Sequence, residues 1–140
     1  MNTNTTLSLS PTQKECKNKL TIKILGIKSK KGQICLSLFN AQPGFPHDGN
    51  KAIKTDCIEI TDTQETVNFS NLEPGNYAVA VFHDINHDGI LNFNWLGIPT
   101  EGFGFSRNPY ILTGLPKFED SAVMVTDLET NIEVKLKYIL

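Results

Sequence analysis

Alternation of apolar and polar residues with a period of two is the feature that most constrains this chain. The alternation comes in short runs bounded by Gly, Pro, Asn and Asp, which is typical of β-strands joined by turns. In residues 130–140, for example, Ile132 and Val134 alternate with charged side chains. Residues 76–83 are apolar on both faces and indicate a central strand. The sequence therefore predicts an all-β fold.

Seven segments show strand character: residues 20–25, 33–40, 54–61, 66–70, 76–83, 121–126 and 130–140. We expect a seven-stranded antiparallel sandwich of immunoglobulin-like or transthyretin-like type, with a closed barrel as the alternative. Residues 1–19 are rich in Asn, Thr, Ser and Lys and predict a disordered N-terminal tail. The single domain would then span residues 20–140.

Charge and hydropathy exclude two classes of partner. The 140 residues carry a formal net charge of −2, spread along the chain, so the basic surface of a nucleic-acid-binding protein is missing. No segment approaches the roughly 20 apolar residues of a membrane span. No apolar leader segment is visible either, which leaves a cytoplasmic location open.

The three cysteines, Cys16, Cys35 and Cys57, have no CxxC spacing. This spacing argues against a zinc knuckle and against a dense disulfide framework. We expect Cys35 and Cys57 to be buried thiols, with a bridge between them as the alternative.

Residues 84–119 form a long insertion without a sustained period. Loops above about 15 residues are uncommon unless they are functional. The insertion contains the only tryptophan, Trp95, the only arginine, Arg107, and five of the ten glycines. We expect it to present a functional face to an unknown protein or small ligand. Alternatively, its aromatic residues hold it against the sandwich as a compact loop.

The insertion begins with the pattern D-x-N-x-D-G, from Asp84 to Gly89. Alternate residues of a tight loop direct their oxygens at one point, and a glycine at the sixth position permits the turn around a hard cation. The pattern resembles the calcium loops of EF-hands and dockerins. The predicted metal ligands, with calcium as the cofactor, are Asp84, Asn86, Asp88, the carbonyl of Ile90, and Asn92.

The pattern departs from those calcium loops at its twelfth position, where Trp95 replaces an acidic ligand. Unless Glu101 folds back, the site has two formal negative charges, and we expect weak affinity in the millimolar range. The alternative is turn chemistry alone, in which the Asp and Asn side chains bind the backbone in Asx-turns.

Other groupings of the same residues suggest other chemistries. His83 and His87, with His47, are alternative ligands for a transition metal, although solvated or capping histidines are the simpler interpretation. Glu101 and Arg107 suggest an ion pair, or an arginine that receives an anionic ligand. The candidate ligand-binding residues outside the cation pattern are His83, His87, Trp95, Glu101 and Arg107.

A hydrolase is a further alternative, with Ser106, His83 and Asp84 as a triad supported by Glu101 and Arg107. The sequence around Ser106 lacks the G-x-S-x-G signature of a nucleophile elbow. No base is placed against a nucleophile by any local motif, so we expect a protein that is not an enzyme.

Five stretches together resemble the bacterial DUF2141 family: residues 31–39, 44–52, FSNLEPGNY at 69–77, AVFHDINHDG at 80–89 and GIPTEGFGFS at 97–106. The Leu72-x-Pro74-Gly75-x-Tyr77 element is also similar to transthyretin-like, carboxypeptidase-regulatory-like sandwich domains. The resemblance implies a β-sandwich in a secreted protein, periplasmic or extracellular. It implies no established activity.

Overall fold

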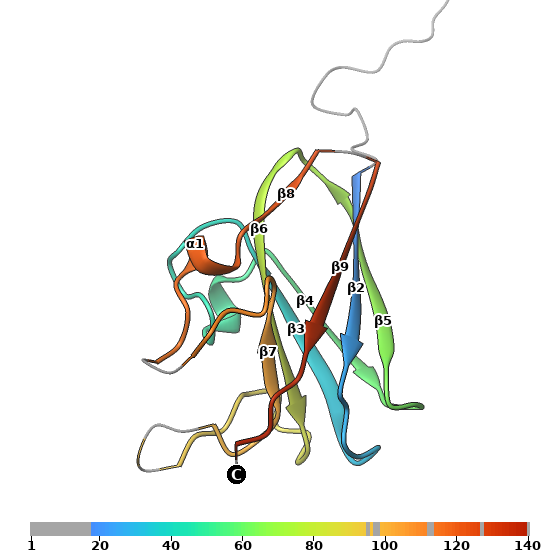
Figure 1. The fold of residues 1–140 in the computed structure, drawn as a ribbon, viewed down its shortest axis with the longest axis vertical. Coiled ribbons are helices and arrows are strands. Elements are labelled where there is room, and N and C mark those ends of the chain that lie inside the picture. Colours follow the sequence, from blue (N-terminus) through green and yellow to red (C-terminus); the bar gives the residue numbers. More distant parts are fainter. Residues whose placement is uncertain (1–17, 95, 97–98, 112–113, 127, 140) are drawn as a thin grey trace, which may run out of the picture.

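Two β-sheets pack face to face in the computed structural model, which describes residues 18–94, 96, 99–111, 114–126 and 128–139 (Figure 1). One sheet has the strand order β5 (Glu65–Leu72), β2 (Asn18–Leu25), β9 (Glu129–Lys135). The other has the order β4 (Lys54–Glu59), β3 (Gln33–Phe39), β6 (Gly75–Asp84), β7 (Phe103–Phe105), and β8 (Val123–Val125) also pairs with β6. A 3-10 turn, η2 (Gly49–Lys51), and a short helix, α1 (Phe118–Ser121), complete the described elements. The predicted all-β, two-sheet sandwich is confirmed.

One strand pair differs from the expected antiparallel arrangement. β9 runs parallel to β2, with Ile22 opposite Ile132. The preceding strand, β8, ends beside the start of β6, because Val125 pairs with Gly75. The chain then reaches the end of the sandwich where β2 begins, and Lys19 N–H donates to the carbonyl of Leu128 (2.9 Å). β9 starts at that end, so it can only run in the same direction as β2.

Two elements inside the predicted insertion also differ from expectation. β7 pairs with β6 and is an additional strand, and α1 follows it. The insertion is therefore divided into the β6–β7 loop, residues 85–102, and a segment that packs beside the sheet. At the other end of the domain, β2 begins at Asn18, two residues before the predicted boundary.

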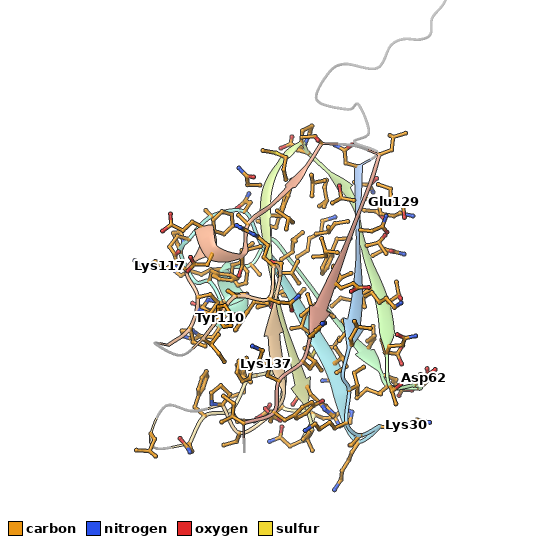
Figure 2. All side chains as sticks on the ribbon, in the orientation of Figure 1. Lys30, Asp62, Tyr110, Lys117, Glu129 and Lys137 are labelled. Atoms are coloured by element: carbon orange, nitrogen blue, oxygen red, sulfur yellow. A yellow bond between two sulfur atoms is a disulfide. The ribbon has the colours of Figure 1, made fainter. Side chains whose placement is uncertain are left out.

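The space between the sheets is filled by aliphatic side chains (Figure 2). The residues with no exposed surface include Leu20, Ile22 and Ile24 of β2, Ile34 and Leu38 of β3, Val79 of β6 and Val134 of β9. Every second residue of each strand contributes, as the period of two predicts. Burial of this apolar surface is the main favourable contribution to folding.

A second, aromatic cluster covers the outer face of the sheet that contains β6. Phe45 packs edge-to-face against Phe39, Phe105 and Phe118, with ring centroids 5.3 to 6.2 Å apart. Phe103 is buried beside Phe105. These contacts hold Phe45 with its loop, β7 and the start of α1 on the sandwich, as the compact-loop alternative predicts. Phe93, in contrast, is 37% exposed, and Trp95 lies outside the described residues.

Cys35 and Cys57 form a disulfide, so the expectation of free thiols is wrong for this pair. Their strands β3 and β4 are antiparallel, and the register places the two residues directly opposite each other, with Cα atoms 4.1 Å apart. The sequence pattern predicts the two strands but not how they pair. It therefore gives no sign that Cys35 and Cys57 lie close together. Cys16 lies outside the described residues.

Among the described helices, none has the length and apolar character needed to cross a membrane.

Candidate functional site

Strand register brings Asp84 between two polar neighbours at the end of β6. On one side, β3 places Gln33 opposite Asp84. On the other side, β7 pairs Phe103 with Phe82, and His83 N–H donates to the carbonyl of Gly102 (2.7 Å). His83 thus lies opposite Gly102, and the next residues in the same register, Asp84 and Glu101, lie beside each other.

The β6–β7 loop folds back on itself so that Glu101 returns to Asp84. Asn92 O accepts hydrogen bonds from the main-chain N–H (2.9 Å) and the hydroxyl (3.3 Å) of Thr100. The neighbouring residues Phe93 and Pro99 form an isolated antiparallel bridge. The loop is thus closed as a hairpin immediately before Glu101.

Three carboxylates meet at this position. Asp84, Asp88 and Glu101 each offer an oxygen, and these oxygens lie within 4.8 Å of one another. Asp84 has no exposed surface and Glu101 is 6% exposed, whereas Asp88 lies at the surface. We call these three residues the acidic cluster. Among the described residues, no other group of three or more His, Cys, Asp or Glu side chains has this proximity.

Neutral N–H donors hold the carboxylate of Asp84 in place. Its Oδ2 accepts from Gln33 Nε2 (2.8 Å) and Gly89 N–H (2.8 Å), and its Oδ1 accepts from Asp88 N–H (3.1 Å). Gly89 has φ of +76°, a left-handed conformation that glycine adopts without a steric penalty. The turn therefore wraps its backbone N–H groups around Asp84, as the turn-chemistry alternative predicts.

Glu101 is fixed in the same way, by the two ends of the turn. Its Oε2 accepts from Ile85 N–H (2.9 Å) and its Oε1 accepts from Asn92 N–H (3.1 Å). Each carboxylate oxygen has two lone pairs, so these bonds orient the carboxylate and leave acceptor capacity. The donors of these bonds to Asp84 and Glu101 are uncharged amides.

Asp88 carries its charge at neutral pH. The N–H of Ile90, which donates to Asp88 Oδ1 (3.1 Å), holds the pKa of this carboxyl below its usual value, and side-chain hydrogen bonds with Asn92, Asp84 and Asn86 act in the same direction. Asp88 thus places a negative charge at the exposed side of the acidic cluster.

The remaining predicted ligands surround the acidic cluster. Asn86 Oδ1 accepts weakly from Asp88 N–H (3.4 Å). Ile90, whose carbonyl was the predicted ligand, donates its N–H to Asp88 Oδ1. The side chain of Asn92 bonds Asp88, and its Oδ1 is buried without a hydrogen-bond partner among the described residues.

The histidines do not assemble into a transition-metal site. His83 is fully buried on the opposite face of β6, where Nε2 bonds the carbonyl of Lys31 (2.6 Å) and Nδ1 bonds the hydroxyl of Tyr138 (2.8 Å). His87 lies exposed on the turn, and the ring of His47 contacts Phe93 instead.

The hydrolase grouping is not assembled either. The hydroxyl of Ser106 is buried, accepts from Val79 N–H (2.9 Å) and donates to the carbonyl of Ser121. It therefore satisfies two main-chain groups that would otherwise lack these hydrogen bonds. Arg107 is exposed and donates to the carbonyl of Glu119 (3.3 Å), and the described residues show no ion pair between it and Glu101.

Two residues that support this region have no signal in the sequence. Gln33 reaches Asp84 only because β3 and β6 pair in this register. Tyr138 reaches His83 across 55 positions of the chain. A correct strand pairing would have been needed to find either residue.

The comparisons with known proteins agree with the resemblance seen in the residues. No curated protein and no solved structure matches the chain. One family model does match, over residues 22–133, and its description is "Uncharacterized protein conserved in bacteria (DUF2141)". The match covers both sheets and the whole β6–β7 loop, and the chain therefore belongs to the DUF2141 family.

Proposed function

We propose that this chain is a non-enzymatic β-sandwich binding module whose β6–β7 loop is ordered by a divalent cation, with calcium as the preferred ion. The observation that carries the proposal is the acidic cluster, where three carboxylate oxygens lie within 4.8 Å of one another. Oxygens that ligate one calcium ion at about 2.3–2.6 Å lie this close to each other. A cation bound between these oxygens would be attracted to each ionised carboxylate of the acidic cluster.

The chemistry of the donors favours calcium over other divalent metals. The acidic cluster offers carboxylate oxygens, which suit hard cations, whereas zinc and copper prefer imidazole or thiolate. Magnesium requires near-ideal octahedral geometry and retains its water. Calcium accepts the irregular arrangement that one turn and one strand end provide.

The side chain of Asn92 gives the proposal a second support, besides the three carboxyl groups. A buried amide oxygen without a donor costs free energy. Rotation of the amide by 180° exchanges its oxygen and nitrogen, so Oδ1 would face Asp88, the carboxylate that the side chain now bonds. A cation would make that orientation favourable. Because Asp88 lies at the surface, we expect an affinity in the weak range for such sites.

A calcium titration followed by thermal unfolding tests the proposal. The protein is stripped with a chelator, and its Tm is measured with increasing calcium and, separately, magnesium. Binding to the folded state stabilises it by about 2.7 kcal/mol at a concentration 100-fold above Kd. We expect a saturable rise in Tm with calcium and a smaller rise with magnesium.

Two matched variants separate the site from general ionic effects. Asp88→Asn removes one cluster charge from an exposed turn, and Asp62→Asn removes one charge from the exposed β4–β5 turn, where the Asp62 label stands in Figure 2. We expect the calcium response to be lost in Asp88→Asn and kept in Asp62→Asn. An unchanged Tm in the parent protein up to several millimolar calcium contradicts the proposal.

We infer, in addition, that the protein works outside the cytoplasm, in the periplasm or extracellular space. The Cys35–Cys57 disulfide supports this inference, because disulfides persist in oxidising compartments. The test is alkylation of protein released from the bacterial periplasm, with and without reduction. We expect Cys35 and Cys57 to react only after reduction; reaction before reduction contradicts the inference.

An immunoglobulin-like or transthyretin-like topology is the finer fold that we propose. Tyr77, near the start of β6, donates its hydroxyl to the carbonyl of Glu73 (2.6 Å). A tyrosine that bonds the backbone just upstream in this way is characteristic of a corner in immunoglobulin-like sandwiches.

A further inference from the structure

A hollow of about 330 Å³ lies on the outer face of the sheet, next to the β6–β7 loop. Its floor is formed by small side chains of three adjacent strands: Ser37 of β3, Thr55 of β4 and Ala80 of β6, together with the Cys35–Cys57 disulfide. Elsewhere on the same face, large aromatic rings fill this layer. The hollow thus exists because the residues at these positions are small.

Two loops form the walls of the hollow. Residues 46–50 form one wall, and the buried Phe45 next to them anchors this loop in the aromatic cluster. Phe82 and residues 89–91 form the other wall. The two loops meet where the rings of His47 and Phe93 make a T-shaped contact, with centroids 6.2 Å apart. The hollow is therefore shaped by loops that are both held in position.

Polar groups in the hollow are available to a ligand. The hydroxyls of Ser37 and Thr55 and the side-chain amide of Asn50 form no hydrogen bond with other described residues. The lining contains no Lys or Arg, and Asp48 is its one carboxylate, so an anionic ligand such as phosphate is disfavoured. Phe82 and Leu91 add apolar surface beside these polar groups.

We propose that this hollow binds a neutral saccharide unit. A sugar ring has hydroxyl groups around its edge and an apolar face of C–H groups, so it matches a floor of hydroxyls beside an aromatic and aliphatic wall. The volume lies at the lower end of the usual range of about 300–1,000 Å³ for small-molecule sites. The floor and one wall lie outside the β6–β7 loop, so this inference goes beyond the cation proposal.

Titration of the full chain with saccharides, followed by amide chemical shifts in NMR spectra, tests the inference. The probes are glucose, N-acetylglucosamine, maltose and cellobiose, each added to millimolar concentrations. All samples contain calcium, so the outcome does not depend on whether the cation site exists. We expect saturable shifts from at least one probe, confined to the amides of Ser37, Thr55, Ala80, Phe82 and Leu91.

A variant that fills the hollow distinguishes this site from others. Thr55 is exposed on the edge strand β4, so Thr55→Tyr adds a ring to the hollow without disturbing the core. We expect affinity to fall by about tenfold or more. The matched control is Ser70→Tyr, at an exposed position of β5, an edge strand of the other sheet, and it should bind normally. The inference is overturned if no probe gives saturable shifts, or if Thr55→Tyr binds as well as the parent protein.

Discussion

Strand β6 contributes both to the interior of the sandwich and to the acidic cluster, yet different interactions hold these two regions. Val81 of β6 is buried among aliphatic side chains, whereas Asp84, three residues later, is buried among N–H donors. Apolar burial acts without regard to ions or to moderate changes of pH. Buried carboxylates depend on hydrogen bonds and on the charges nearby. From this difference we expect the interior to set the fold and the β6–β7 loop to respond to solution conditions.

The largest effect is expected in the interior. Leu36 is 1% exposed, and Leu36→Ala leaves a cavity in the space between the sheets. We expect a loss of about 3 kcal/mol in the free energy of unfolding, measured by chemical denaturation. The loss should be the same in calcium and in chelator, because Leu36 belongs to the interior and not to the acidic cluster. A loss that depends on calcium would show that the two regions are coupled.

A smaller effect, which does depend on calcium, is expected at Glu101. Glu101→Gln keeps the shape of the side chain but replaces one acceptor with an amide N–H, which faces the N–H of Ile85 or Asn92. We expect a loss of about 1–2 kcal/mol in chelator. In calcium the gap to the parent protein should widen, because the variant also loses a ligand. Denaturation under both conditions measures this difference, and an equal gap would contradict it.

The smallest effect concerns Tyr138, between the two regions. Burial raises the pKa of Tyr138 above its usual value, so the folded state favours the neutral phenol. The unfolded chain ionises first as pH rises past about 10, and stability should therefore fall above that pH. Tyr138→Phe loses the bond to His83, at a cost of about 1 kcal/mol near neutral pH, and should flatten this alkaline decline. An alkaline decline as steep as in the parent protein would assign it to other groups.

Strands that are long and alternate regularly could be predicted from the sequence, and those that depend on pairing could not. Residues 76–83 are apolar on both faces because the sheet that contains β6 is covered on both sides. β7 is only three residues long and contains Gly104, so no period of two develops. The direction of β9 was hidden because alternation is the same in parallel and antiparallel strands.

The candidate site also has a part that could be predicted from local sequence and a part that depends on strand pairing. Asp84 and Asp88 lie within one turn, and their local spacing already indicates a common centre. Glu101 reaches them through the hairpin at residues 92–100 and the pairing of β7 with β6, so its place in the acidic cluster depends on contacts distant in the sequence. The disulfide was hidden for the same reason, since only the register of β3 and β4 sets Cys35 opposite Cys57.

The cation site is tested most directly by anomalous diffraction from crystals grown with calcium. We predict an anomalous peak at about 2.3–2.6 Å from oxygens of Asp84, Asp88 and Glu101. We also predict that the amide of Asn92 is turned so that Oδ1 faces the peak. Well-ordered side chains of the acidic cluster with no peak between them, in crystals that contain millimolar calcium, would contradict the proposal.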